Sequence, residues 1–423
     1  MVPQAFVRLC AVGTILVLAA VIVANSVTKD VGRDEQMYCT AGALLTQGKM
    51  IYRDFSYPSQ LPYHPLLLSI CYKVLGTTHY LFVGRLVSAV SDILVVLGIV
   101  VIYRSIFTPR RTEGLLFGLA AAVLYVFNPF VDYAVGYAWN HDVVILFVVT
   151  ALGLLLTTNF QSPTRWRIGL IGVLLTTATC MRVTTALVEV VFLGAILWMA
   201  MGSLRNKVRA ALPFLVGALV MLAWPAWVIA QAPEAFWLNL VRIPTLYDRW
   251  LREIGMTLDK AALTATAILT PACLILLILA AGLLWVGRLR RTNLDAQERK
   301  KAVAAALLPL VFILIAYIPP TMWLQYLAVP VPFIAIALAY PLAAIRRHGS
   351  SHDLARRVTT FAVPAAAVVT VLLGSASLSR SAFLLVPEKW EPIRVHRVSR
   401  TLMEQAKEPK RVLTLGPLYS LEA

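Results

Sequence analysis

The chain has 423 residues, of which 59% are hydrophobic and only 14% are charged, and its formal net charge is +17. Soluble domains carry about 25% charged residues, so this composition excludes a water-soluble fold of this size. Apolar runs of about 20 residues recur along the chain, which predicts membrane-crossing helices rather than the short alternating segments of a β-barrel. The positive charge lies in short loops between the runs, which favours contact with membrane lipids over a nucleic-acid partner.

In chain order, the apolar runs predict an all-α, polytopic transmembrane bundle of about eleven spans. The run 168–203 is too long for one helix, so a break is expected at Met181-Arg182. We expect residues 1–380 to form the transmembrane domain and residues 381–423 to form a short extracytoplasmic tail. The predicted spans are residues 5–27, 81–104, 114–131, 142–158, 168–181, 183–203, 211–230, 261–287, 302–318, 322–344 and 358–377.

Basic residues alternate between the loops that join these spans. The loops at 104–111, 165–167, 205–209, 288–301 and 346–357 hold 18 Lys or Arg residues, and the short connections between them hold one, Arg182. Basic loops face the cytoplasm in multi-pass proteins. The pattern therefore predicts a multi-pass protein of the cell membrane with a cytoplasmic N-terminus, and with the 28–80 loop, the 231–260 loop and the tail outside.

The first outer loop, residues 28–80, carries the densest cluster of acidic, aromatic and basic side chains. Its apolar spacing over 35–47 predicts an amphipathic helix on the outer membrane surface, and Gly48 suits the position that ends a helix. Asp34 and Glu35 stand at the start of this helix, where the helix dipole favours negative charge. Asp34 is then either an ordinary helix cap or a catalytic carboxylate at a water–lipid boundary.

The loop resembles the first outer loop of GT-C membrane glycosyltransferases, in particular the dolichyl-phosphate-mannose protein mannosyltransferase-like enzymes and their RgtA/B/C/D-like bacterial relatives. A late Gln-Tyr-x-x-x-Pro-x-Pro stretch adds to the resemblance, and most of residues 1–345 follow the family in span order. A family Lys-Pro-Pro motif is replaced by other residues at 59–65. The matching residues are Asp34-Glu35, Tyr38, Ala41, Leu45, Gly48, Tyr52, Asp54-Phe55, Gly84-Arg85-Leu86, Gln325-Tyr326, Pro330 and Pro332.

The resemblance implies transfer of a sugar from a polyprenyl-phosphate carrier to an acceptor hydroxyl at the outer face, by a single inverting displacement. Asp34 is implied as the base, and Glu35 as a group that orients Asp34 or the acceptor. A retaining route would need a second carboxylate, for which Asp142 is the candidate. The acceptor remains open between a lipid, a protein and a polysaccharide.

Further candidates follow from their place near the outer headgroups. Arg182, Arg53 and Arg242 are candidates to bind the donor phosphate, against the alternatives of snorkelling or surface ion pairing. No metal is predicted, although a divalent ion between Asp34 and Asp142, with His141 nearby, stays open. The candidates for substrate binding are Tyr52, Asp54, His141, Asp142, Gln325 and Tyr326.

Two other functions compete with the glycosyltransferase. A transporter or lipid flippase would require charges along a path through the membrane and paired repeats, and the chain has few charges within its spans. A non-catalytic scaffold with the same fold is the third hypothesis. Cys39 and Cys71 both fall in the first outer loop, where a disulfide could persist, and the sequence leaves their pairing open.

Overall fold

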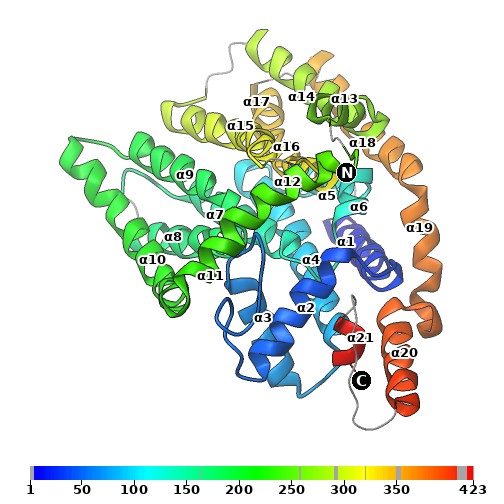
Figure 1. The fold of residues 1–423 in the computed structure, drawn as a ribbon. Helices are drawn as coiled ribbons and strands as arrows, with labels where there is room; N and C mark the ends of the chain where they lie inside the picture. Colours follow the sequence, from blue (N-terminus) through cyan, green and yellow to red (C-terminus); the bar gives the residue numbers. More distant parts are fainter. Residues whose placement is uncertain are drawn as a thin grey trace.

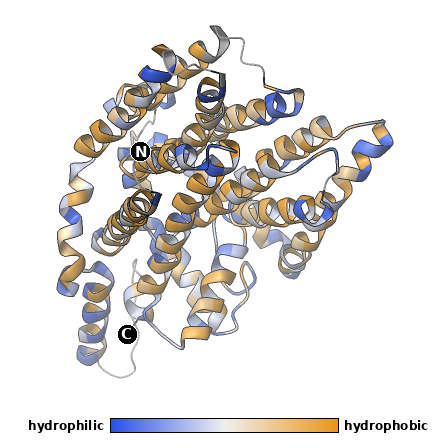
Figure 2. Cartoon of the chain, turned by 180° about the vertical axis from the view of Figure 1, so that it is seen from behind, coloured by the Kyte–Doolittle hydropathy of each residue, from blue (hydrophilic) through white to orange (hydrophobic). Residues whose placement is uncertain are grey.

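The structure is a computed structural model that describes residues 4–162, 164–256, 259–289, 294–319, 321–348, 354–406 and 417–422. In these residues every regular element is a helix, and an isolated bridge between Ile51 and Phe55 is the sole β pairing. Figure 1 shows the helices packed as one bundle, and Figure 2 shows that the helices inside it are mostly hydrophobic. The predicted all-α bundle is confirmed.

One set of helices makes up the bundle itself. They are α1 (Gln4–Thr28), α4 (Tyr80–Ile106), α5 (Arg111–Val126), α7 (His141–Thr157), α8 (Arg165–Thr179), α9 (Ala186–Met199), α10 (Leu204–Gln231), α13 (Lys260–Leu269), α14 (Pro271–Leu289), α15 (Ala296–Tyr317), α16 (Pro330–Ala337), α17 (Ala339–His348) and α18 (Leu354–Leu373).

The other helices lie in the loops and the tail. They are α2 (Arg33–Thr46), α3 (Tyr63–Leu75), α6 (Pro129–Ala134), α11 (Pro233–Trp237), α12 (Ile243–Glu253), α19 (Ser375–Ser381), α20 (Glu391–Gln405) and α21 (Pro417–Leu421). Single turns of other helix types cover Val183–Thr185, Leu238–Arg242, Leu324–Leu327, Ala382–Leu385 and Pro387–Lys389.

Six helices in the described residues are long and apolar enough to cross a membrane, or seven if the bent pair α13 and α14 counts as one span. The helices α5, α7, α8 and α9, at 14 to 17 residues, are shorter than a full crossing usually requires. An integral multi-pass protein is therefore supported, while the count of eleven spans stays a prediction.

The helices depart from the predicted spans in two places. The span predicted at 261–287 bends by 77° between Lys260–Leu269 and Pro271–Val286, because Pro271 cannot continue the hydrogen bonds of the preceding helix. The span predicted at 114–131 ends at Val126, where the Asn128 side chain accepts a hydrogen bond from Phe130 N–H and caps the next helix. The break predicted at Met181-Arg182 is present, between α8 and α9.

Glycines bring two of the helices unusually close together. A Cβ atom on Gly172 of α8 would lie 2.1 Å from the Phe214 carbonyl oxygen of α10. A Cβ atom on Gly217 of α10 would lie 2.3 Å from the Gly169 carbonyl oxygen of α8. Small residues at such crossings let helix backbones pack closely where burial from water provides no driving force.

The first loop and the tail meet at one end of the bundle. Helices α2 and α21 are packed against each other near the start of α4, and the Glu422 Oε1 atom accepts a hydrogen bond from Leu81 N–H at 2.6 Å. The basic loops gather elsewhere, where Arg346 binds Glu113 at 2.8 Å and Arg347 binds Glu298 at 2.6 Å. The first loop and the tail, which the charge pattern assigns to one side of the membrane, are thus in contact.

Candidate active site

A buried carboxylate fixes the start of α2. Glu35 is fully buried, and its two oxygens bind the Arg85 guanidinium at 2.8 Å each. The same oxygens accept hydrogen bonds from Gly32 N–H at 2.7 Å and Ala138 N–H at 2.6 Å. Every strong acceptor position of Glu35 is therefore occupied, and Gly32 rather than Asp34 is the helix cap. Glu35 orients the helix that carries Asp34 and has no oxygen available to take a substrate proton.

Arg85 extends this network across the loop that follows α1. Its guanidinium donates hydrogen bonds to the carbonyl oxygens of Ser26 at 2.9 Å, Lys29 at 2.6 Å and Asp30 at 3.0 Å. A buried arginine needs such compensation, because an unpaired charge in a protein interior is costly. One side chain of α4 therefore holds both the end of α1 and the start of α2.

Lys29 binds the segment 132–138, which is the end of α6 and the turn after it, next to the start of α2. Its ammonium donates to the Val135 carbonyl oxygen at 2.7 Å and lies 4.7 Å from the centre of the Tyr137 ring. Burial lowers the pKa of Lys29 to about 7, although the negative charge of Asp132 acts in the opposite direction. This segment thus positions Ala138 against Glu35, and Tyr137 and Trp139 line the same cavity as Asp34.

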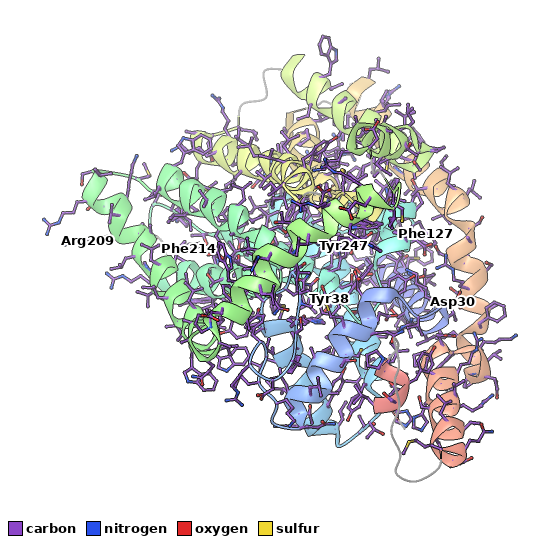
Figure 3. All side chains as sticks on the ribbon, viewed as in Figure 1. Asp30, Tyr38, Phe127, Arg209, Phe214 and Tyr247 are labelled. Atoms are coloured by element: carbon purple, nitrogen blue, oxygen red, sulfur yellow. The ribbon has the colours of Figure 1, made fainter. Side chains whose placement is uncertain are left out.

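The cavity at the start of α2 has a volume of about 850 Å³. Five of the predicted site residues line it, from segments far apart in the chain: Asp34, His141, Arg182, Gln325 and Tyr326. The exposed carboxylate of Asp34 thus shares one space with the Arg182 guanidinium. Figure 3 shows Tyr38 of α2 and Tyr247 of α12, two further lining residues, in the middle of the view.

Arg182 occupies the break between α8 and α9. Its guanidinium carbon lies 4.9 Å from the centre of the Tyr326 ring, and its Nη1 atom is 3.5 Å from His141 Nδ1. An arginine on an aromatic face keeps its N–H donors directed sideways, where an anion can bind them. Arg182 and Tyr326 are therefore in contact, although their spacing in the sequence could not predict this.

Aromatic rings form the side of the cavity next to Asp34. Tyr38 is buried, and its ring makes edge contacts with Tyr57 at 6.0 Å and His64 at 5.0 Å. Burial and then the charge of Asp34 raise the pKa of the Tyr38 hydroxyl well above its usual value, while Arg182 acts in the opposite direction. The Tyr38 hydroxyl therefore stays protonated and can donate a hydrogen bond in the cavity.

Two asparagines that the sequence analysis did not single out hold the cavity walls together. Asn140 donates to Gln60 Oε1 and to the Met181 carbonyl oxygen, both at 2.8 Å. The Asn239 Oδ1 atom accepts hydrogen bonds from Ser56 Oγ at 2.6 Å and Tyr57 N–H at 2.8 Å. The contacts with Gln60, Ser56 and Tyr57 join the first outer loop to residues 80 or more positions away, so no local pattern could have revealed them.

The remaining predicted site residues lie outside the lining of the cavity. Arg53 and Asp54 form an exposed ion pair at 2.9 Å, which lowers the pKa of Asp54 to about 2, and Arg242 is exposed. Tyr52 is buried, and its hydroxyl donates to the Gln60 carbonyl oxygen at 2.6 Å, so it acts on the cavity through a lining residue. Asp142 is buried and accepts a hydrogen bond from Gly136 N–H at 2.9 Å.

The sequence left open a metal site near Asp34 and a disulfide between Cys39 and Cys71. Within the described segments, no three His, Cys, Asp or Glu side chains lie close enough together to hold a metal ion. The Nδ1 atom of His141 faces the Arg182 guanidinium, which is a poor environment for a cation. Cys39 and Cys71 are free thiols, and Cys39 is buried with its sulfur 3.8 Å from the Tyr80 carbonyl oxygen.

Solved structures share this fold over nearly the whole chain. No family model matches the sequence, and no curated protein matches it. ArnT from Cupriavidus metallidurans bound to undecaprenyl phosphate matches 99% of this chain and 75% of its own, at 14% identity and a TM-score of 0.61. The apo form of ArnT matches 98% of this chain and 84% of its own, at 14% identity and a TM-score of 0.63.

An oligosaccharyltransferase from Archaeoglobus fulgidus, in a complex with Zn and sulfate, matches 94% of this chain but 55% of its own, at 15% identity and a TM-score of 0.56. The archaeal oligosaccharyltransferase AglB from Archaeoglobus fulgidus, in complex with an inhibitory peptide and a dolichol-phosphate, matches 95% of this chain and 58% of its own, at 11% identity and a TM-score of 0.51. The chain therefore has the fold of the GT-C membrane glycosyltransferases.

Proposed function

We propose that the chain is a membrane glycosyltransferase that moves a sugar from a polyprenyl-phosphate donor to an acceptor hydroxyl at the outer face of the cell membrane. The observation that carries the proposal is that Asp34 and Arg182 line the same cavity of about 850 Å³. Glycosyl transfer from a phosphate carrier needs a base and a phosphate-binding cation on the two sides of the sugar. The fold is that of enzymes with this kind of chemistry.

In the proposed reaction, the Asp34 carboxylate accepts the proton of the acceptor hydroxyl. The hydroxyl oxygen forms a bond to C1 of the sugar while the bond from C1 to the phosphate oxygen breaks, so the configuration at C1 inverts. The phosphate leaves on its lipid with one more negative charge. Arg182 binds that charge, and the Tyr326 ring keeps the guanidinium in place.

The walls of the cavity suit a donor with a lipid tail. Phe312, Ile315 and Val329 line it beside the polar groups, so an isoprenoid chain can lie against apolar surface while its phosphate reaches Arg182. The ArnT structure holds undecaprenyl phosphate, and the AglB structure holds a dolichol-phosphate. We infer a polyprenyl-phosphate sugar as the donor for this chain, and a lipid, protein or polysaccharide hydroxyl as the acceptor.

The test compares Asp34→Asn with Asp30→Asn, a matched change at an exposed acid of the same loop that does not line the cavity. Membranes that contain each variant receive undecaprenyl phosphate carrying radiolabelled mannose, glucose or arabinose, and loss of label from the lipid is measured. We expect Asp34→Asn to slow transfer by about 100- to 10,000-fold, as for loss of a general base. Asp30→Asn should transfer at the wild-type rate. Normal transfer by Asp34→Asn, or no transfer by the wild type, refutes the proposal.

A further inference from the structure

A second cavity, of about 750 Å³, lies where the basic loops gather. It is bounded by the end of α4, the end of α7, the start of α8, and parts of α15 and α17. None of its lining residues lines the Asp34 cavity. The charge pattern of the loops places it at the cytoplasmic face.

The lining is strongly cationic. Five basic side chains face this space with one acid, Glu298: Arg104, Arg111, Arg167, Lys301 and Arg347. Glu298 is already bound to Arg347 at 2.6 Å, so it neutralises one of the five charges at most. The cavity therefore keeps a net positive charge of about four, which favours an anion within it.

Two of the arginines are held by backbone carbonyl groups. Arg347 Nη2 donates to the Ile106 carbonyl oxygen at 2.6 Å, and Arg167 Nη1 donates to the Thr157 carbonyl oxygen at 3.2 Å. In the part of the chain that the structure describes, the side chains of Arg104, Arg111 and Lys301 make no hydrogen bond or ion pair. The cavity thus combines two positioned guanidinium groups with three cations whose donors are available for a ligand.

The edge of the cavity is apolar and exposed. Val101 lines the cavity with 58% of its surface accessible, and Trp166, beside Arg167, is 61% accessible. The Arg167 guanidinium carbon lies 5.5 Å from the centre of the Trp166 ring. An exposed tryptophan next to arginine at the end of an apolar helix is typical of the lipid headgroup region. A ligand with acyl chains can therefore reach the cations from the membrane.

We propose that this basic cavity is a binding site for the phosphate-bearing headgroup of an anionic lipid. Phosphate is the group that matches clustered Arg and Lys donors, because guanidinium groups bind its oxygens in pairs. The apolar edge at Val101 and Trp166 favours a membrane lipid over a soluble phosphate ester. The site is separate from the Asp34 cavity, so the proposal stands or falls independently of the transferase reaction.

The test measures lipid binding to the full-length protein in detergent micelles by fluorescence anisotropy of labelled phosphatidic acid. The cavity variant combines Arg104→Gln, Arg111→Gln and Lys301→Gln. The matched control combines Arg205→Gln, Lys207→Gln and Arg209→Gln, which removes the same charge from the start of α10, outside the cavity. Figure 3 shows Arg209 pointing away from the bundle at the start of α10.

We expect the cavity variant to bind phosphatidic acid about 100-fold more weakly than the wild type, since each basic side chain near a headgroup contributes severalfold. The control should stay within about twofold at an ionic strength of about 0.15 M, because distant charges are screened. Inorganic phosphate should fail to displace the lipid at equal concentration.

Three results overturn the proposal: no lipid binding by the wild type, an equal loss in both triple variants, or displacement of the lipid by an equal concentration of inorganic phosphate. The first shows that the cavity binds no lipid, the second leaves only general charge attraction, and the third indicates a soluble ligand. Thermal unfolding of each variant checks that it is folded. If the cavity triple unfolds, the single changes Arg104→Gln and Arg205→Gln replace the triples, with the same expected order of affinity.

Discussion

Arg182 and Arg53 are both sequence candidates for the donor phosphate, but their surroundings differ. Arg182 is half-buried in the wall of the Asp34 cavity, where its guanidinium rests on the Tyr326 ring. Arg53 is exposed, and its guanidinium binds both oxygens of Asp54, at 3.0 and 2.9 Å. A charge in a partly dry cavity acts on a phosphate much more strongly than a charge in water.

We therefore predict that Arg182→Gln lowers kcat/KM for a labelled polyprenyl-phosphate sugar by about 100-fold, the usual loss for a group that stabilises a developing negative charge. Arg53→Gln serves as the control and should change kcat/KM by less than about twofold. Steady-state transfer rates in purified membranes provide the measurement. A larger loss in Arg53→Gln than in Arg182→Gln would contradict this assignment of the phosphate site.

The sequence predicted some residues of the cavity and missed others for one physical reason. Asp34 and Tyr38 belong to a local motif at helical spacing, and Arg182 stands out as a lone cation in a short connection. The Glu35–Arg85 pair joins positions 50 residues apart, and the Asn239 contacts join positions more than 180 apart. Such pairings depend on how helices pack, which no local pattern records.

At the scale of single elements, the crossing of α8 and α10 depends on the absence of side chains. A methyl group at Gly217 would lie 2.3 Å from the Gly169 carbonyl oxygen, whereas nothing lies within 4 Å of a methyl group at Gly194 of α9. Alanine is normally the better helix former by about 1 kcal/mol, so the two changes should act in opposite directions.

We predict that Gly217→Ala destabilises the protein by about 1–3 kcal/mol through overpacking. Gly194→Ala should leave the stability unchanged or raise it slightly. Thermal unfolding in detergent, followed by circular dichroism, distinguishes the two variants. Equal thermal unfolding midpoints for the two variants would show that α8 and α10 do not cross at this contact.

Helix α21 brings a carboxyl group into a buried position beside α4. Burial raises the pKa of Glu422 to about 7 from an ordinary value of 4.5, even though Leu81 N–H donates to it. The docked tail therefore binds more protons than the undocked tail between these two values. Its docking is strongest below about pH 4.5, weakens as the pH rises, and reaches its lowest level above about pH 7.

We predict that hydrogen-exchange protection of residues 417–422, corrected for the intrinsic effect of pH, falls between pH 4.5 and about 7. Glu422→Gln should remove this dependence, because an amide does not titrate in the range. Glu404→Gln, at an exposed position of α20, should keep it. Protection that rises with pH in the wild type would show that Glu422 is not buried by docking.

The elements themselves were predictable to different degrees. Apolar runs predicted most of the bundle helices, and Gly48 follows the end of α2 with a φ of +83°, as its conformational freedom suggests. The amphipathic stripe of α2 is covered by protein rather than lying bare on the membrane, since α3 packs so closely that a Cβ on Gly42 would lie 2.8 Å from Leu68 Cβ. Hydrophobicity indicates that a face is covered, but not by which partner.

At the scale of the whole molecule, the structure divides the chain into two ends. The Asp34 cavity, the first loop and the tail lie at one end, and the basic cavity lies where the loops rich in Arg and Lys meet. The positive-inside rule assigns the basic end to the cytoplasm. We therefore expect the proposed reaction to take place outside the cell and the proposed lipid site to lie on the cytoplasmic side.

We predict that a single cysteine at Lys49 reacts with a membrane-impermeant maleimide in intact cells, because this exposed position lies in the first loop. A single cysteine at Arg205, which is exposed at the start of α10, should react only after the cells are permeabilised. The five native cysteines are first replaced by alanine. The reverse pattern of labelling would invert the assigned topology and exclude an extracytoplasmic Asp34.

The Arg85 network has a consequence for biosynthesis. Residues 26–35 emerge from the ribosome before Arg85, and Ala138 follows still later, yet all of them must meet around one carboxylate. Until α4 is made, Glu35 lacks the guanidinium that binds both of its oxygens, so the network at the start of α2 is incomplete. A nascent chain that ends before α4 therefore lacks the contacts that orient Asp34, and the proposed active site is complete only after Ala138 has been made.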